Sequence, residues 1–366
     1  MADKVYLRPA GFVDAPFGLD GKVARLAGGL LWFSQVETIA GGTGATDLVS
    51  VADIDRFIAG LGADQRQAAA AAWANLTAPR LPLKLGDRVV RLDQPQVVGI
   101  VNITPDSFSD GGRYGDAAAA GNAGFAMAAA GAALVDVGGE STRPGAKPVW
   151  EEDEKARVLP VLAQLLGSGT AVSLDTRKAA VMEAALAIGP LMINDVSALT
   201  FDPRAAEVVA RSACPVVLMH HQGPPETMQE VPRYERPVLL EVYDWLEERI
   251  EAAVAAGIER SRIIVDPGIG FGKTVQHNLQ LLNGLAMLHG LGCPVMLGAS
   301  RKRMIGALAG EAPADQRLAG SIALALKGAD QGVQLLRVHD VVETVQAIRV
   351  WRGLRDAALT PPQEGS

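Results

Sequence analysis

Short apolar runs alternate with helical stretches from residue 97 almost to the end of the chain. The helical stretches carry apolar residues three and four positions apart, as in residues 151–169 and 236–257. The apolar runs are nearly continuous and rich in β-branched residues, which predicts parallel strands buried on both faces. Eight such runs occur, with the sequences VVGIVNI, ALVDVGG, AVSLDT, LMINDVS, PVVLMHH, IIVDPGI, PVMLGAS and LLRVHD.

Eight strand–helix units within roughly 260 residues predict an α/β protein with a (β/α)8 or TIM barrel. An open, doubly wound sheet is the alternative. It is disfavoured because it requires no particular number of units, and because the polar residues do not gather at one switch point. Residues 83–95 alternate apolar and polar positions around Gly86-Asp87, which predicts a hairpin that plugs the bottom of the barrel.

The pattern divides the chain into three parts. Residues 1–82 form an N-terminal appendage of unknown role, with a strand-like stretch at 22–39 and an alanine-rich helix at 63–76. Residues 83–358 form the barrel, and residues 359–366 form a frayed tail.

Nearly every predicted strand turns polar at its carboxyl end, where barrel active sites are assembled. Any one of these residues could cap a helix. Eight sets in register instead predict a site for a polar ligand, because polar groups in buried strands are costly unless they are satisfied. In strand order, the residues are Asn102, Asp136, Asp175 with Thr176, Asn194 with Asp195, His220 with His221, Asp266, Ser300 with Arg301 and Lys302, and Arg337 with His339.

The residue types narrow the ligand. Asp175, Asn194 and Asp266 offer acceptors and one amide donor, which suits the amino-pyrimidinone edge of a heterocycle, and Lys302 can donate to its carbonyl group. Arg337 and His339 lie two apart and therefore face the same side of their strand. Together with Thr142, Arg143 and Arg301 they predict a phosphate pocket, and Asn102 with a nearby loop aspartate could hold a hydrated Mg²⁺.

Composition excludes several classes of partner. The chain of 366 residues is 49% hydrophobic and has a net charge of −7, with no basic stripe, so it predicts no nucleic-acid partner. Cys214 and Cys293 lie far apart, and each precedes a proline and an apolar run, which suggests small buried thiols in a reducing compartment. The uncharged stretch 117–135 is mostly alanine and glycine and predicts a core helix followed by a strand, not a membrane span. The N-terminus lacks the apolar segment of a secretory signal, so we expect a cytoplasmic protein without a membrane partner.

Motifs along residues 83–355 resemble those of the dihydropteroate synthases, in the same order. They are GIVNITPDSFSDGG, DVGGESTRPGA, SLDT, INDVSA, VLMHHQGPPETMQ, VDPGIGFGKT, LGASRKRMIG and LRVHD. The family is a pterin-binding TIM barrel. It condenses (7,8-dihydropterin-6-yl)methyl diphosphate with p-aminobenzoate to give 7,8-dihydropteroate and diphosphate in folate biosynthesis. The resemblance implies these small-molecule substrates, Mg²⁺ as cofactor, and a homodimer.

The resemblance also implies roles for single residues. The pterin would be held by Asp175, Asn194, Asp266 and Lys302 with Phe271 beside the ring, Mg²⁺ by Asn102, and the diphosphate by Thr142, Arg337 and His339. Two loops, one with Asp106, Phe108 and Asp110 and the other with Ser141, Arg143 and Pro144, would shape the p-aminobenzoate pocket, with Ser300 near its carboxylate. We expect the catalytic contributions to come from Asp110, Arg143, Asp175 and Lys302.

Two alternative functions remain open at this point. A corrinoid-linked methyltetrahydrofolate methyltransferase uses a related barrel but needs neither a diphosphate pocket nor the SFSDGG and STRPGA loops. A non-catalytic pterin-binding paralogue would be expected to lack Asn102, Lys302, Arg337 or His339, all of which are present. The chain departs from the family pattern at Arg177, where a less charged residue is expected, and at His221, where methionine is commoner.

Overall fold

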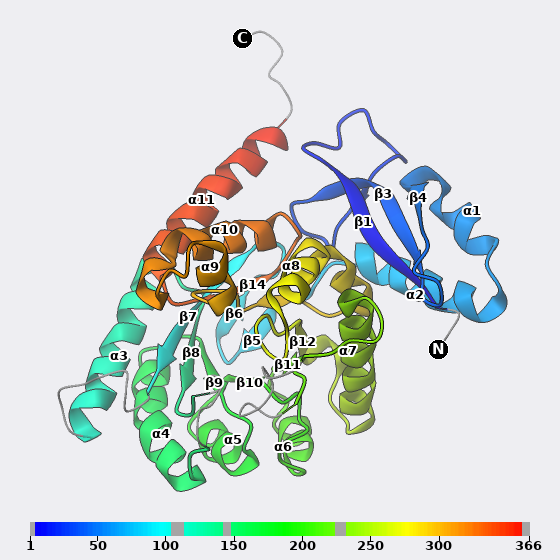
Figure 1. Ribbon diagram of the computed structural model, residues 1–366. Coiled ribbons are helices and arrows are strands. Elements are labelled where there is room, and N and C mark those ends of the chain that lie inside the picture. Colours follow the sequence, from blue (N-terminus) through cyan, green and yellow to red (C-terminus); the bar gives the residue numbers. More distant parts are fainter. Residues whose placement is uncertain (1–3, 104–112, 142–147, 224–231, 361–366) are drawn as a thin grey trace.

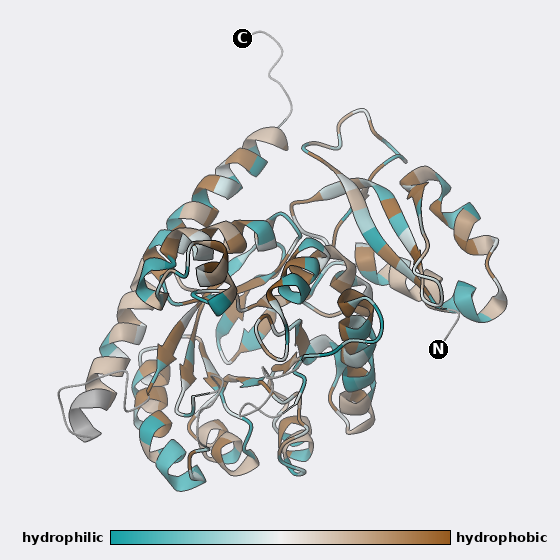
Figure 2. Ribbon diagram, viewed as in Figure 1, coloured by the Kyte–Doolittle hydropathy of each residue, from teal (hydrophilic) through white to brown (hydrophobic). Residues whose placement is uncertain are grey.

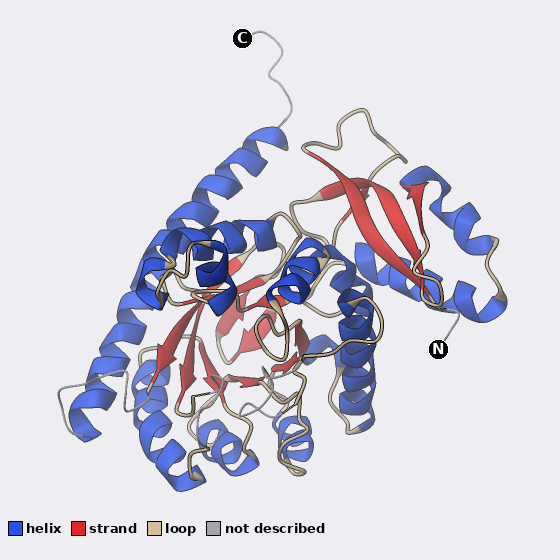
Figure 3. Cartoon of the chain, in the orientation of Figure 1, coloured by secondary structure: helices blue, strands red, loops and turns tan. Residues whose placement is uncertain are grey.

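The computed structural model describes residues 4–103, 113–141, 148–223 and 232–360. Its centre is a sheet of eight parallel strands in the order β12-β11-β10-β9-β8-β7-β14-β13 (Figures 1 and 3). A bridge between Val265 and Val295 joins the two ends of this order, so the sheet closes and the predicted barrel is confirmed. The strands are β7 (Gln96–Asn102), β8 (Leu134–Gly138), β9 (Val172–Asp175), β10 (Met192–Asp195), β11 (Val216–Met219), β12 (Ile263–Asp266), β13 (Met296–Leu297) and β14 (Leu335–Val338).

Helices connect the successive strands and surround the sheet (Figure 3). Figure 2 shows apolar positions concentrated on the central strands and polar positions on the helices around them. In the described part of the chain, no helix is long and apolar enough to cross a membrane. The helices are α3 (Arg113–Ala130), α4 (Glu151–Gly167), α5 (Ala179–Leu186), α6 (Ala205–Ser212), α7 (Val238–Ala255), α8 (Val275–Asn283), α9 (Arg303–Leu308), α10 (Leu318–Ala329) and α11 (Val341–Ala358), with short 3₁₀ turns η2 (Arg260–Arg262), η3 (Leu285–Leu291) and η4 (Ala314–Gln316).

The strands separate two apolar cores, because successive side chains of a strand point to opposite faces. One set, including Val135 and Leu174, packs outward in the larger core with the helices. The other set, including Leu134 and Met192, packs inside the barrel. The predicted hairpin is present as β5 (Leu83–Leu85) and β6 (Arg88–Val90). Its apolar residues belong to the inner core, so it packs against the inside of the barrel.

The N-terminal residues form an antiparallel sheet beside the barrel (Figure 1). Strand β3 pairs with β1, β2 and β4, and the alanine-rich helix predicted at 63–76 is present as α2. The division of the chain at residue 82 stays a prediction. The elements are β1 (Val5–Val13), β2 (Ala24–Arg25), β3 (Trp32–Ala40), β4 (Thr46–Ser50), η1 (Val51–Asp53), α1 (Ile54–Ala59) and α2 (Ala63–Thr77).

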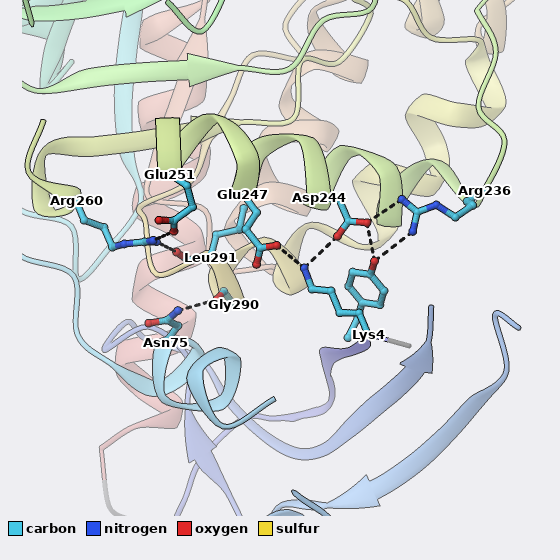
Figure 4. Close-up of polar contacts among 10 residues, drawn as sticks. Lys4, Asn75, Arg236, Asp244, Glu247, Glu251, Arg260, Gly290 and Leu291 are labelled. Carbon is cyan, nitrogen blue, oxygen red and sulfur yellow. Dashed lines mark hydrogen bonds and ion pairs between the residues drawn. The ribbon is translucent and has the colours of Figure 1, made fainter. Parts of the chain in front are cut away.

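Polar and apolar contacts join this sheet to the barrel helix α7. Asp244 on α7 accepts hydrogen bonds from Lys4 Nζ at 3.0 Å, Tyr6 Oη at 2.7 Å and Arg236 Nη2 at 2.8 Å. Figure 4 shows Lys4 and Arg236 reaching Asp244 from opposite sides. Lys4 also contacts Glu247 at 2.6 Å. Tyr6 also belongs to the larger apolar core, which includes residues of the barrel helices. The hydrogen bonds of Asp244 therefore lie beside an apolar contact between the N-terminal sheet and the barrel.

A second connection links α2 to η3. Asn75 on α2 donates to the carbonyl oxygen of Gly290 at 2.9 Å, as Figure 4 shows. Arg80, just after α2, donates to the carbonyl oxygen of His289 at 2.8 Å. Burial of the guanidinium lowers the pKa of Arg80 to about 10. These bonds join α2 and the residues after it to backbone carbonyl groups of η3, and the His289 carbonyl also accepts from the N–H of Gly292.

Replacing Asp244 tests how strongly the appendage and the barrel are coupled. Asp244→Ala should lower the free energy of unfolding by about 1–3 kcal/mol, because it leaves three donors without their shared acceptor. Urea denaturation measures this change. Glu247→Ala on the same helix is the matched control, since Glu247 has one described polar partner and its side chain is 46% exposed; it should cost less than about 1 kcal/mol. Equal effects of the two substitutions would show that Asp244 does not join the two parts.

Candidate active site

The candidate site consists of side chains that point into the barrel at the carboxyl ends of the strands. The inner core fixes which positions point inward, because Leu134, Met192 and Ile264 belong to it. Residues two positions further along each strand must point the same way. The inward-facing polar residues found by this rule are Asn102, Asp136, Asp175, Asn194, Asp266 and Arg337.

Arg337 on β14 lies between two buried carboxylates. Its Nε donates to Oδ2 of Asp136 at 2.6 Å, and its Nη2 donates to Oδ2 of Asp175 at 2.8 Å. The same Asp136 oxygen accepts from Nδ2 of Asn194 at 3.1 Å. The structure therefore brings together three predicted site residues, Asp175, Asn194 and Arg337. Asp136 links Asn194 to Arg337. It was among the predicted polar residues at the strand ends, but no role was predicted for it.

The acids of the site are held in an environment that disfavours their charge. Burial raises the pKa of Asp175 well above its ordinary value, and the nearby Asp136 adds to this, although Arg337 opposes both. Burial also raises the pKa of Asp266 to about 6, against the N–H of Gly268 and the charge of Lys302. Buried acids with raised pKa values are typical of functional sites. A ligand with N–H donors would stabilise their ionised form.

Lys302, Phe271 and Asp266 form a second group. The Lys302 ammonium lies 4.1 Å from the ring centroid of Phe271, a cation–π contact. Gly270 has φ +84° and lies against the lysine side chain, so that a Cβ there would be 3.2 Å from Lys302 Cδ. Gly298 lies between the two groups, because a Cβ on it would be 3.7 Å from Oδ2 of Asp266 and 4.0 Å from Cδ of Arg337. The group around Asp266 therefore lies next to the group around Arg337, with Gly298 between them.

The β12–α8 loop, residues 267–274, is tied to the end of β11. Lys273 is fully buried and its Nζ donates to the carbonyl oxygen of Phe271 at 2.9 Å and lies 2.8 Å from Nδ1 of His220. Burial lowers the pKa of both Lys273 and His220. Lys273 was not predicted. The signal that could have found it is a lysine inside an otherwise apolar, glycine-rich segment.

Ser300 and His339 meet at the neighbouring strand ends. Ser300 Oγ lies 3.0 Å from Nδ1 of His339 and accepts from the His339 backbone N–H at 3.2 Å. The structure therefore brings these two predicted residues together. Arg301, expected in the phosphate pocket, donates from Nε to Asp340 at 3.0 Å on the loop that follows β14, and its place in that pocket stays a prediction.

Two residues of the predicted polar ring face away from the barrel interior, which corrects that part of the prediction. Asp195 follows the inward-facing Asn194, so its carboxylate points outward and accepts from Ser197 and from the backbone N–H of Leu199. His220 follows the inward-facing end of β11 and packs edge-on against Trp245 of α7, with ring centroids 4.9 Å apart. Both residues make contacts within the fold around the strand ends, Asp195 in the turn after β10 and His220 against Trp245.

Residues at the base of the second predicted loop form an ion-pair cluster. Ser141 is half-buried and follows Glu140, whose carboxylate accepts from the backbone N–H of Val149 at 2.9 Å. Glu140 also accepts from Nε of Arg177 at 3.0 Å, and the Arg177 guanidinium lies 4.0 Å from the ring centroid of Phe201. The unexpected arginine at 177 therefore has a structural partner. His221, the other departure, contacts the carbonyl oxygen of Gly223 through Nδ1 at 3.1 Å.

Several predicted residues cannot be placed. Those of the two long loops lie outside the described residues, and they are Asp106, Phe108, Asp110, Thr142, Arg143 and Pro144. The described part of the chain has no cluster of three His, Cys, Asp or Glu side chains that could hold a metal. Asn102, the predicted metal ligand, is half-buried, and its amide oxygen lies near the Asp175 side chain across Gly138. One amide oxygen suits Mg²⁺, which usually keeps several waters and takes few protein ligands besides substrate phosphates.

Comparison with known proteins places this site in a family. Residues 98–339 match the model of the family described as pterin binding enzyme. A dihydropteroate synthase of Neisseria meningitidis serogroup B is 49% identical over 276 residues, which are 72% of this chain and 94% of the relative. The Escherichia coli dihydropteroate synthase is 45% identical over 260 residues, 71% of this chain and 91% of the relative.

Solved structures agree with the sequence matches. A Xanthomonas albilineans dihydropteroate synthase with 4-aminobenzoic acid has a TM-score of 0.71 and 48% identity, and covers 75% of this chain and 98% of its own. The same organism's enzyme in complex with 7,8-dihydropteroate has a TM-score of 0.68 and 46% identity, with the same coverage. The barrel and its inward-facing polar ring thus coincide with a matched family model and with relatives aligned over nearly their whole length, and the chain belongs to the dihydropteroate synthase family of pterin-binding enzymes.

Proposed function

We propose that the chain is a transferase that condenses (7,8-dihydropterin-6-yl)methyl diphosphate with p-aminobenzoate, giving 7,8-dihydropteroate and diphosphate. The observation that carries the proposal is that hydrogen-bond acceptors and cationic side chains lie together at one end of the barrel. Acceptors for a pterin edge, Asp175, Asn194 and Asp266, share that end with the cationic groups Lys302 and Arg337.

The pterin would lie among the first group. A pterin edge offers ring N–H and NH₂ donors and one carbonyl acceptor. Asp175, Asn194 and Asp266 provide acceptors, and Lys302 provides a donor for the carbonyl group. The ring of Phe271 lies against the Lys302 ammonium, so it supports that ammonium from the side of the β12–α8 loop.

The diphosphate would lie toward Arg337 and His339. Arg337 donates from Nε to Asp136 and from Nη2 to Asp175. A guanidinium has five N–H donors, so donors remain for an anion. His339 is oriented by Ser300. Asn102 would contribute its amide oxygen to Mg²⁺, and the ion would neutralise charge on the diphosphate when bound.

The chemistry follows from the charges. The C–O bond between the exocyclic methylene and the diphosphate breaks, and the dihydropterin carries the developing positive charge. Asp175 and Asp266 in their ionised forms stabilise that charge, while Arg337 and His339 stabilise the departing diphosphate. The arylamine nitrogen then forms the new C–N bond and releases a proton. Because an arylamine is uncharged at neutral pH, the step needs no strong base.

The oligomeric state and the cellular location of the protein are also proposals. We expect the protein to act as a homodimer, which light scattering would test. We also expect it to work in the cytoplasm, where dihydropterin and p-aminobenzoate would be available to it as soluble substrates.

Pyrophosphate release separates the proposed function from the alternatives. The protein with both substrates and Mg²⁺ should release pyrophosphate in proportion to the pteroate formed, and omission of p-aminobenzoate should suppress it. A coupled pyrophosphate assay with chromatography of the product measures both. A non-catalytic paralogue would bind the pterin without release. A methyltransferase would transfer methyl groups from methyltetrahydrofolate and release no pyrophosphate, and either outcome would exclude the proposal.

Removing the Lys302 ammonium should weaken binding of the pterin diphosphate. In Lys302→Ala, the pterin carbonyl loses its donor inside the barrel, which should cost about 1–3 kcal/mol, or about 5- to 150-fold in Kd. Isothermal titration calorimetry measures this. Lys84→Ala is the control, because Lys84 is an exposed lysine of the hairpin at the opposite end of the barrel. Unchanged affinity in Lys302→Ala would remove Lys302 from the site.

Neutralising Asp266 should abolish activity and stabilise the ligand-free fold. A carboxyl group whose pKa is raised to about 6 destabilises the folded state above that pH. Asp266→Asn should therefore raise the free energy of unfolding by about 1–3 kcal/mol at pH 8. The gain should shrink as the pH falls from about 6 to about 4 and vanish near about pH 3, where the carboxyl group is protonated in both states. Urea denaturation at the two pH values tests the sign, with the exposed Asp55→Asn as control. A loss of stability at pH 8 would contradict the assignment.

A further inference from the structure

Asp136 on β8 has an unusual position in the site. Its side chain is 1% exposed, and its Oδ2 accepts from both Arg337 Nε at 2.6 Å and Asn194 Nδ2 at 3.1 Å. Its Oδ1 is buried and has no hydrogen-bond partner among the described atoms. One oxygen therefore contacts a residue of the pterin group and a residue of the diphosphate group at the same time.

The contact with Asn194 fixes the direction of an amide group. An amide has a donor end and an acceptor end of almost equal size, so its direction depends on its partners. An ionised carboxylate only accepts, so Asp136 binds the NH₂ end of Asn194. The amide oxygen of Asn194 then stays available as an acceptor, which is what the N–H edge of a pterin requires.

The contact with Arg337 fixes a guanidinium. Asp136 holds Nε and Asp175 holds Nη2, so two of the planar group's nitrogens are held in place. An arginine held at one point could rotate, whereas an arginine held at two cannot. The remaining donors therefore keep one direction before any ligand arrives.

We propose that Asp136 is a positioning residue for both arms of the substrate site, because its single Oδ2 sets the acceptor end of Asn194 toward the pterin and the guanidinium of Arg337 toward the diphosphate. The inference rests on the proposed function and deepens it. A purely structural role would affect stability when the charge of Asp136 is removed, whereas a positioning role affects the affinity for both ligands.

Binding measurements on the full chain test the proposal. The probes are 6-hydroxymethylpterin, which lacks the diphosphate, and inorganic pyrophosphate with Mg²⁺, each titrated by calorimetry. In Asp136→Asn, the new amide can offer either end to Asn194, and Arg337 loses one of its two anions. We expect both affinities to fall at least about tenfold. The melting temperature should change little, because Asp175 still pairs with Arg337 in the variant. Asn194→Ala should weaken the pterin alone. Asp202→Asn should change neither affinity, because Asp202 is a half-buried acid in the loop before α6, where it accepts from the backbone N–H of Ala179.

A double substitution tests the mechanism directly. In Asp136→Asn/Asn194→Asp the two side chains exchange donor and acceptor, so residue 194 presents a carboxylate oxygen to the pterin whichever way it turns. The affinity for 6-hydroxymethylpterin should return to within about threefold of the wild type, since the hydrogen bond is kept. If Asp136→Asn does not fold, the double variant alone decides by the same criterion.

The outcomes separate the inference from the function on which it rests. If the wild type binds neither probe, the proposed function fails and the inference falls with it. If the wild type binds both and folded Asp136→Asn binds both equally well, the inference alone is wrong. If pterin affinity is not restored in the double variant, Asp136 does not act through Asn194, and the proposal is overturned.

Discussion

The guanidinium of Arg337, shared by two buried carboxylates, is the interaction on which the centre of this barrel depends. Asp136 and Asp175 are both almost fully buried, and two anions so close in a low dielectric would cost several kcal/mol without a cation between them. Through Asp136 the same charge reaches Asn194. Four of the eight strands, β8, β9, β10 and β14, therefore meet at one cation, and the polar end of the barrel is organised before any ligand is present.

Much of the fold could be predicted from the sequence, because the spacing of apolar residues and the local composition distinguish buried strands from helices. Buried strands are nearly continuous runs of apolar residues, and the count of eight identifies the closed sheet. The hairpin at 83–90 and the helix α2 follow from the same kind of pattern. The two cysteines, Cys214 and Cys293, are buried and free, as their apolar surroundings suggested.

The site could be predicted only in part. The face of its strand that a side chain occupies, here called its parity, and the residues that it contacts both depend on the tertiary structure. Asn194 and Asp195 are adjacent polar residues at one strand end, yet only Asn194 faces the interior, and the parity is visible only once the inner core is known. The contacts of Asp136 and Lys273 were not predicted, because their partners lie on other strands or are backbone atoms of the same loop. The ion pair of Arg301 with Asp340 could not be predicted either, because Asp340 lies on a different loop. The family resemblance supplied roles that residue types alone leave open.

The β12–α8 loop has a consequence for molecules designed to occupy this site. A Cβ at Gly268 would lie 1.8 Å from the carbonyl oxygen of His220, and one at Gly272 would lie 2.6 Å from Cβ of Gln222, so neither position can accept a larger residue without moving the backbone. Both glycines also have positive φ, at +64°, which side chains disfavour. An inhibitor that takes its contacts from this backbone would meet a surface that point mutations can hardly alter. Escape from such an inhibitor would have to arise elsewhere in the chain.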